Sequence, residues 1–154
     1  MFRKKALETI VPSTIILPGV EEVLKELSER GFKMSIATTK IREHIDGILD
    51  KFSWYDYFDM VIGGDEVEKV KPDPEMFLTI IDRLNETKLS SAVIGDTEND
   101  ILAARAIPVK AIALECPYGG EEKVIASSPD FYLNSISELP ELLSGAKIEQ
   151  RENK

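Results

Sequence analysis

Two aspartates, Asp96 and Asp100, follow an apolar run at residues 91–95 and lead into a segment typical of a helix at residues 101–106. The apolar run predicts a buried strand, so Asp96 is expected at its carboxyl end and Asp100 in the first turn of the helix. In an open α/β sheet, ligands bind at the carboxyl ends of the strands, and carboxylate oxygens there suit Mg²⁺. A turn aspartate followed by a helix-capping aspartate explains the same pair equally well.

Thr38 and Lys71 are two further polar residues that parallel strands would bring to the same edge. Thr38 follows the apolar run 32–37, and Lys71 begins a Lys-Pro-Asp-Pro segment at the entrance to a predicted helix. A hydroxyl, an ammonium and two carboxylates would then converge. Together they form a cradle for a phosphoryl group, in which Lys71 and a metal ion offset negative charge and Thr38 donates a hydrogen bond.

Thr38 and Lys71 each have a simpler interpretation when taken singly. Thr38 is then a helix cap, and Lys71 a solvated loop lysine. Lys69 is a second candidate for the lysine of the site, but the backbone is fixed only after Lys71. There Asp73 is the expected helix cap, with Pro74 at the first helical position. Only the convergence of these residues favours a phosphoryl site over the simpler interpretations.

Strands and helices alternate along the chain. Apolar runs predict the strands, and apolar residues at helical spacing predict the helices. The expected strands cover residues 32–37, 60–62, 92–94, 109–114 and 131–133, and the expected helices cover residues 20–30, 41–52, 74–84, 101–106 and 137–143. This order predicts an α/β fold, a three-layer Rossmann-like core in which helices cover both faces of a mostly parallel sheet.

Length predicts one domain, and composition limits its partners. The 154 residues include 28 acidic and 19 basic side chains, for a formal charge of −9, which argues against a nucleic-acid partner. The longest apolar stretch, residues 9–20, contains two prolines and is too short to cross a bilayer. We therefore expect a cytoplasmic protein with no membrane partner. An N-terminal segment (1–16), a core (17–145) and a polar tail (146–154) are the expected parts.

The single cysteine gives no sign of a thiol site. Cys116 has no second thiol for a disulfide or a metal site, and His44, the only histidine, lies far away in the sequence. We therefore expect Cys116 to be a packed or loop thiol.

Three motifs, in order, resemble the haloacid dehalogenase-like hydrolase superfamily, and within it the phosphoglycolate phosphatase-like branch. Ile36-Ala-Thr-Thr-Lys40 is similar to the second family motif, which implies that Thr38 and its neighbour Thr39 bind phosphate. Thr39 stands where the family usually has asparagine. Lys71-Pro-Asp-Pro74 is similar to the third motif and implies that Lys71 neutralises the phosphoryl group. The fourth motif is similar to residues 95–100 and implies that Asp96 and Asp100 bind Mg²⁺.

The first family motif, a strand ending in Asp-X-Asp, has no counterpart in these residues, because no aspartate precedes Asp46. The resemblance implies that this strand carries the attacking aspartate and lies in the middle of the sheet. We therefore expect no nucleophile, weak Mg²⁺ binding and a central gap. Neither Glu8 nor Glu21 follows a predicted strand, so neither is expected to replace the nucleophile.

The gap must be filled, because each buried backbone group left unpaired costs about 1–3 kcal/mol. Residues 9–17 contain the spare apolar runs of the chain, so we expect them to occupy or border the gap as a replacement strand. A remnant of the linker to a cap domain is the other interpretation of the N-terminal segment. A second copy of the chain or a separate polypeptide could also donate the missing strand.

Three interpretations of function remain. The first is the core of a Mg²⁺-dependent phosphatase for small phosphate esters, inactive as an isolated chain because it lacks the nucleophile. The second is a non-catalytic module that binds Mg²⁺, an anion or a partner. The third is the product of a truncated reading frame. The substrate is not predicted, because in the resembling family the cap domain selects it.

Overall fold

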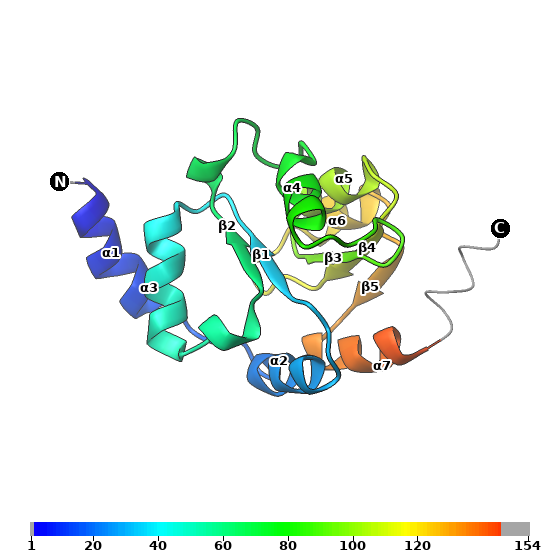
Figure 1. Cartoon of the computed structure of the whole chain (residues 1–154), viewed down its shortest axis with the longest axis horizontal. Coiled ribbons are helices and arrows are strands. Elements are labelled where there is room, and N and C mark those ends of the chain that lie inside the picture. The colour runs from blue at the N-terminus through cyan, green and yellow to red at the C-terminus, as the bar shows by residue number, and fades with distance from the viewer. Residues whose placement is uncertain (1, 146–154) are drawn as a thin grey trace.

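Helices and parallel strands alternate along the chain, which confirms the predicted α/β fold (Figure 1). The computed structural model describes the backbone of residues 2–145 and the side chains of residues 8–145, so the expected tail at residues 146–154 lies outside the described residues. The helices are α1 (Phe2–Ser13), α2 (Val20–Glu29), α3 (Arg42–Phe52), α4 (Glu75–Arg83), α5 (Glu98–Arg105), α6 (Glu121–Ala126) and α7 (Leu139–Ser144). The strands are β1 (Ser35–Ala37), β2 (Met60–Ile62), β3 (Ala92–Gly95), β4 (Lys110–Leu114) and β5 (Phe131–Leu133), and the short 3-10 helices are η1 (Tyr55–Tyr57), η2 (Gly64–Glu66) and η3 (Ile136–Glu138).

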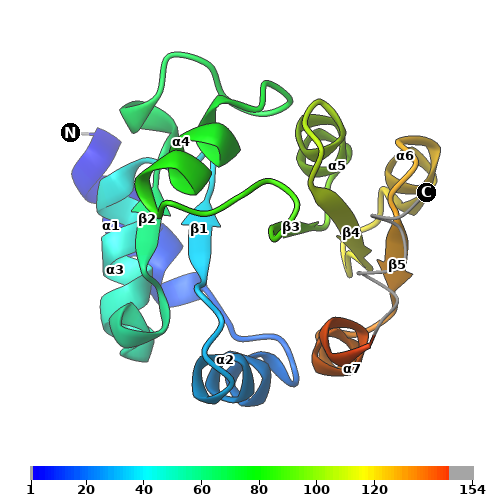
Figure 2. The ribbon, with the colours of Figure 1, turned by 45° about the vertical axis from the view of Figure 1, so that its right-hand side comes forward.

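The strands form two parallel sheets, β1-β2 and β3-β4-β5. Within the described residues, no backbone hydrogen bond joins β1 to β3, and Figure 2 shows the two strands facing each other without pairing. Ile94 on β3 and Ile112 on β4 are partners in register, yet Ile94 is 39% exposed and Ile112 is 0% exposed. The side of β3 that faces β1 is an open sheet edge, because among the described strands β3 pairs only with β4.

Apolar clusters cover both faces of the β3-β4-β5 sheet. Alternate residues of β4 point to opposite faces. Ala111 and Ala113 pack with side chains of α4, α5 and α6, whereas Ile112 packs with side chains of α2 and α7. Figure 1 shows α4 and α5 above this sheet and α2 and α7 below it. The two clusters also reach the other sheet, because Ala37 and Met34 pack against one cluster each.

Residues 9–17 do not fill the gap between the sheets, so the prediction of a replacement strand is wrong for this structure. Residues 9–13 belong to α1, and residues 14–17 form no strand. α1 packs against α3, on the outer side of the β1-β2 sheet (Figure 1). Lys51 Nζ donates to the carbonyl oxygens of Val11 at 3.2 Å, Pro12 at 3.0 Å and Thr14 at 2.7 Å. These bonds satisfy carbonyls at the end of the helix and hold the segment away from the strands.

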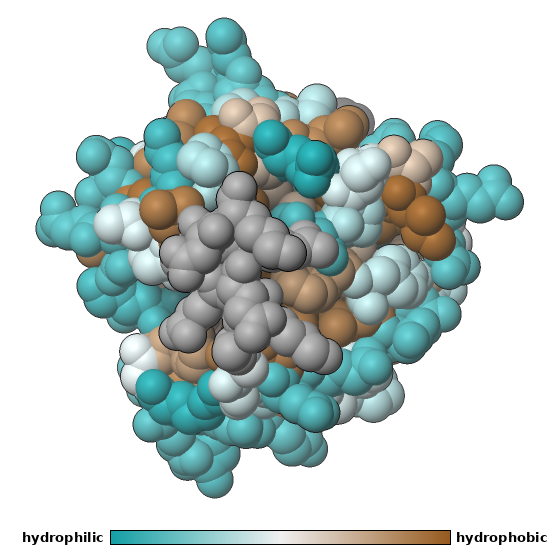
Figure 3. Space-filling model, turned by 90° about the vertical axis from the view of Figure 1, so that its right-hand side faces the viewer, coloured by the Kyte–Doolittle hydropathy of each residue, from teal (hydrophilic) through white to brown (hydrophobic). Residues whose placement is uncertain are grey.

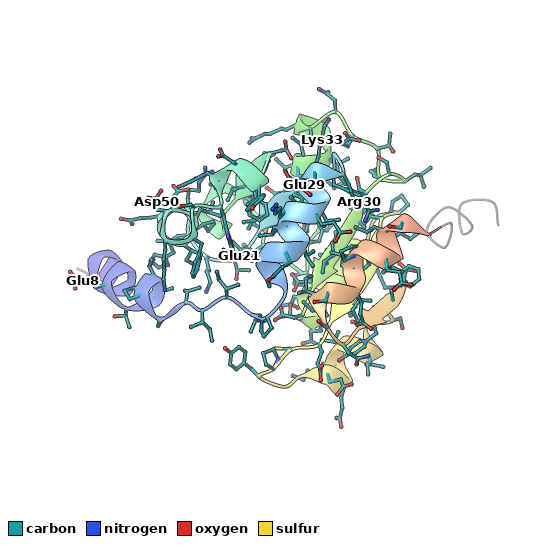
Figure 4. All side chains as sticks on the ribbon, turned by 90° about the horizontal axis from the view of Figure 1, so that it is seen from below. Glu8, Glu21, Glu29, Arg30, Lys33 and Asp50 are labelled. Atoms are coloured by element: carbon teal, nitrogen blue, oxygen red, sulfur yellow. The ribbon has the colours of Figure 1, made fainter. Side chains whose placement is uncertain are left out.

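The two early glutamates also lie on helices. Glu8 is exposed on α1, and Glu21 is exposed on α2, where it accepts a hydrogen bond from Trp54 Nε1 at 3.3 Å. Figure 4 shows both side chains on these helices, well apart from each other. Neither glutamate follows a strand, in agreement with the expectation.

Several helix boundaries differ from the predicted ones because other residues act as caps. α5 starts at Glu98 and not after Asp100, since Thr97 is its N-cap. The last helix is expected over residues 137–143, but Ser137 lies inside η3, where Ser135 Oγ accepts from the Ser137 amide at 3.2 Å, and α7 begins later. Pro74 is the N-cap of α4 and not its first residue.

The surface agrees with the acidic composition. Seen from the side of α5, α6 and α7, it is mostly hydrophilic with separate smaller hydrophobic patches (Figure 3). In the part of the chain that the structure describes, no helix has the length and apolar character needed to cross a bilayer.

Candidate functional site

Lys71 connects the ends of two strands that do not pair. Its Nζ donates to the carbonyl oxygen of Ala37, the last residue of β1, at 3.0 Å. It also forms an ion pair with Asp100 Oδ1 at 2.5 Å, and the two side chains are only 11% and 10% exposed. Lys69, by contrast, is exposed, and its amide donates to Glu75. Of the two candidate lysines, Lys71 is thus the one at the carboxyl edge of the sheets.

Asp100 is both a helix cap and a partner of Lys71. Its Oδ2 accepts hydrogen bonds from the Thr97 amide at 3.2 Å and the Thr97 hydroxyl at 2.7 Å. Thr97 in turn accepts from the Asp100 amide, which completes a capping box at the start of α5. The helix-cap interpretation of Asp100 is therefore confirmed, with Oδ2 in the cap and Oδ1 in contact with Lys71. The Mg²⁺ interpretation stays a prediction.

Gly95 provides the space that Asp100 occupies. A Cβ atom at position 95 would lie 2.3 Å from Asp100 Cβ and 2.5 Å from its Cγ. Sequence reasoning did not identify Gly95 or Thr97 as supports of the site. The capping spacing of Thr97 and Asp100 could have revealed Thr97, whereas the need for glycine depends on a contact that only the folded chain shows.

Thr38 lies directly after β1, and hydrogen bonds fix its position. Its amide donates to the Ile62 carbonyl at 3.1 Å, and its Oγ1 accepts from the Lys40 amide at 3.2 Å. Because the hydroxyl oxygen is an acceptor here, its hydrogen is free to be donated to a ligand. The neighbouring Thr39 is exposed.

Asp96 follows β3 and is exposed, with no hydrogen bond or ion pair to any described residue. Its carboxylate is available to a ligand. Lys71 and Asp100 are therefore in direct contact, whereas Thr38 and Asp96 stand at the ends of β1 and β3 without bonding to either of them. Of the four residues predicted to converge, Lys71 and Asp100 thus form a direct pair, and Thr38 and Asp96 lie beside them at the strand ends.

The carboxylates fit half of a Mg²⁺ site. Mg²⁺ is typically held by one or two protein carboxylates, with waters and phosphate oxygens as its other ligands. Asp96 can supply a free carboxylate, and Asp100 can supply the oxygen that now contacts Lys71. Over the described residues, no group of three or more histidine, cysteine, aspartate or glutamate side chains is arranged to hold a metal ion. A complete cation site needs a further ligand.

Comparison with known proteins identifies the family of the chain. The model of the family described as haloacid dehalogenase-like hydrolase matches residues 2–114. The chain belongs to the haloacid dehalogenase-like hydrolase family. It is 36% identical over 125 residues to pyrophosphatase PpaX of Halalkalibacterium halodurans, which covers 81% of this chain and 58% of that protein. It is 33% identical over 150 residues to the phosphoglycolate phosphatase of Aquifex aeolicus, covering 97% of this chain and 68% of that protein.

Solved structures of this family share the fold. A predicted phosphoglycolate phosphatase from Haemophilus somnus superposes with a TM-score of 0.84 at 24% identity, covering 92% of this chain and 63% of that chain. A HAD-superfamily hydrolase from Geobacter sulfurreducens superposes with a TM-score of 0.73 at 26% identity, covering 86% and 63%. The chain thus spans about three fifths to two thirds of the length of the proteins compared here.

Proposed function

We propose that this chain is the core of a Mg²⁺-dependent phosphatase for small phosphate esters, and that the isolated chain does not turn over substrate. The contact of Lys71 with both the end of β1 and Asp100 carries the proposal. An ammonium held beside two strand ends can offset the charge of a phosphoryl group there. The similarity to a phosphoglycolate phosphatase and a pyrophosphatase supports a phosphate substrate.

In the proposed site, each residue has a separate task. Thr38 donates its hydroxyl hydrogen to a phosphoryl oxygen, with Thr39 beside it in the binding loop. Lys71 neutralises charge on the phosphoryl group. Asp96 and Asp100 hold Mg²⁺, which when bound would stabilise the developing negative charge. The cytoplasmic location and the core at residues 17–145 remain predictions.

The missing group is a nucleophile in line with the phosphorus atom. Covalent catalysis needs a carboxylate held at that position, and the proposal already assigns Asp96 and Asp100 to the metal ion. We propose that an additional strand between β1 and β3 supplies it from a separate polypeptide. A second copy of the chain could complete the sheet, but it has the same sequence and no aspartate before Asp46. The open edge of β3 supports this, since among the described strands β3 pairs only with β4.

A non-catalytic Mg²⁺- or anion-binding module is the second candidate function. The pairing of Lys71 with Asp100 favours it, because this ion pair neutralises one of the two proposed metal ligands in the chain as it stands. Such a module would bind phosphate and Mg²⁺ weakly without any turnover.

An assay with a generic aryl phosphate and Mg²⁺ tests the proposed function. The purified chain is compared with Asp96→Asn and with the control Asp50→Asn, which removes the same charge from an exposed position on α3. We expect no turnover by any of the three, and Mg²⁺ binding that weakens only in Asp96→Asn. Turnover that is lost in Asp96→Asn would contradict the inactivity of the isolated chain. If all three proteins bind Mg²⁺ with the same affinity, the assignment of Asp96 to a metal site is contradicted.

A further inference from the structure

The loop after β1 and the loop after β2 are joined by a set of hydrogen bonds outside the proposed catalytic residues. The Gly64 amide donates to the Lys40 carbonyl at 2.8 Å. The Arg42 amide donates to Asp65 Oδ1 at 2.8 Å, and Arg42 Nη1 donates to Glu66 Oε1 at 3.3 Å. We call Arg42, Asp65 and Glu66 the clasp, because they connect residues 40–42 with residues 63–66.

Arg42 is anchored at several points. Its Nε donates to Asp46 Oδ1 at 2.9 Å within α3, and its Nη1 also donates to the Val61 carbonyl of β2 at 3.0 Å. The hydrogen bond that Arg42 donates to the Asp46 carboxylate raises the pKa of Arg42, so its guanidinium stays charged. A planar guanidinium with fixed partners on a helix and a strand has little freedom, and this keeps Glu66 in one position.

Glu66 holds the backbone of the second loop. Its Oε2 accepts a hydrogen bond from the Gly63 amide at 2.7 Å, and Gly63 is buried. A hydrogen bond to a charged acceptor is about twice as strong as a neutral one, whereas an exposed ion pair contributes little. The bond from Gly63 is therefore the main contribution of Glu66, and the contact with Arg42 orients the carboxylate.

The clasp acts on the loop that carries Thr38. A Cβ atom at Gly64 would lie 2.5 Å from the Thr39 carbonyl oxygen, and one at Gly63 would lie 2.9 Å from the Lys40 carbonyl oxygen. The two loops are thus in backbone contact, and the Lys40 amide is the donor that orients the Thr38 hydroxyl. Residues 63–66 are therefore connected through Lys40 to the Thr38 hydroxyl.

We infer that Glu66 and Arg42 are positioning residues, which hold residues 38–40 in the geometry that binds a phosphate oxyanion even when no strand occupies the gap. This inference rests on the proposed function, because it assigns the preformed loop to the same phosphate site. Glu66 touches neither the ligand nor the metal in this arrangement. It acts through the Gly63 amide and the Lys40 carbonyl on Thr38.

The test compares Glu66→Ala and Glu66→Gln with Glu68→Ala, a control at an exposed glutamate two residues away whose side chain makes no described contact. Two readouts are taken: the Kd for inorganic phosphate in the presence of Mg²⁺, and amide hydrogen exchange of residues 38–40. We expect Glu66→Ala to raise the Kd about ten-fold, as for the loss of one hydrogen bond to a charged group. Exchange at residues 38–40 should accelerate while the thermal midpoint stays near that of the control.

Glu66→Gln should fall between the unmodified chain and Glu66→Ala, because its amide oxygen can still accept from Gly63. If Glu66→Ala does not fold, Arg42→Lys replaces it, since one ammonium cannot take the places of both Nε, which contacts Asp46, and Nη1, which contacts Val61 and Glu66. If Glu66→Ala has the same phosphate Kd and the same amide exchange at residues 38–40 as Glu68→Ala, the inference is overturned. If the unmodified chain binds no phosphate, the proposed function fails, and unchanged exchange at residues 38–40 would then separately overturn the positioning role.

Discussion

The two sheets are stabilised in different ways. The β3-β4-β5 sheet is covered on both faces by apolar clusters in which Ile101, Ala103 and Ile112 are fully buried. The β1-β2 sheet has two three-residue strands, and polar contacts such as the Arg42 network hold its loops. The proposed site lies where the two sheets meet, with Thr38 after β1 of the β1-β2 sheet and the two aspartates after β3 of the β3-β4-β5 sheet. The half of the molecule with the β1-β2 sheet therefore supplies the loop that binds the anion. The half with the β3-β4-β5 sheet supplies a rigid base for the carboxylates.

The largest effect is expected from Ile112→Ala. Removing this fully buried side chain from β4 should lower the free energy of unfolding by about 2–5 kcal/mol, through lost burial and a residual cavity. Ile94→Ala, its partner in register on β3, should cost clearly less because Ile94 is 39% exposed. Urea unfolding of both variants checks this. Equal losses would mean that the edge of β3 is covered in solution and that the gap is closed.

Lys71→Met should come next. It leaves the Asp100 carboxylate buried without its cation, which costs about 3 kcal/mol, at the low end for a broken buried ion pair because Thr97 still donates to Asp100. Thermal unfolding measures the loss. Lys69→Met is the matched control and should be close to neutral, since Lys69 is exposed. A Lys71→Met protein as stable as this control would show that the contact between the two halves is not maintained.

Gly95→Ala should have a smaller effect on stability and a larger one on the site. The added Cβ would lie 2.3 Å from Asp100 Cβ, so the start of α5 must shift. We expect a loss of about 1–3 kcal/mol, as for overpacking of a filled site, and weaker Mg²⁺ binding. Calorimetry with Mg²⁺ measures the second effect. An unchanged Mg²⁺ affinity would mean that Asp100 does not belong to the metal site.

Lys51→Met should have the smallest effect and should be local. It removes the donor to the carbonyls of Val11, Pro12 and Thr14 at the end of α1, at a cost of about 1 kcal/mol. Amide exchange should accelerate in α1 and remain unchanged in β3, β4 and β5. Lys25→Met, on the exposed side of α2, is the control. Faster exchange in both sheets would mean that the two halves unfold as one unit.

Much of this arrangement could be predicted from local patterns. The alternation of apolar runs identified every strand, and the strand ends identified Thr38 and Asp96, because parallel strands share a carboxyl edge. The choice of Lys71 over Lys69 came from the prolines that follow it. These features depend on a few neighbouring residues, which is why the sequence alone could indicate them.

The features that were missed depend on distant contacts. Residues 9–11, Thr-Ile-Val, are all three β-branched, which suggested a strand. They form a helix in which Lys51, about forty positions away, donates to the final carbonyls. The contact of Arg42 with Glu66 spans 24 positions, and no spacing rule indicates it. The requirement for glycine at position 95 likewise follows from the place of Asp100 in the fold.

A titration of the chain with inorganic phosphate, with and without Mg²⁺, tests the central claim most directly. If Thr38, Lys71, Asp96 and Asp100 form half of a phosphatase site, phosphate should bind more tightly with Mg²⁺ present. Asp96→Asn should abolish that enhancement, and Asp50→Asn should retain it. Phosphate binding that Mg²⁺ does not change, or that is equally enhanced in both variants, would contradict a metal-assisted phosphate site at the ends of β1 and β3.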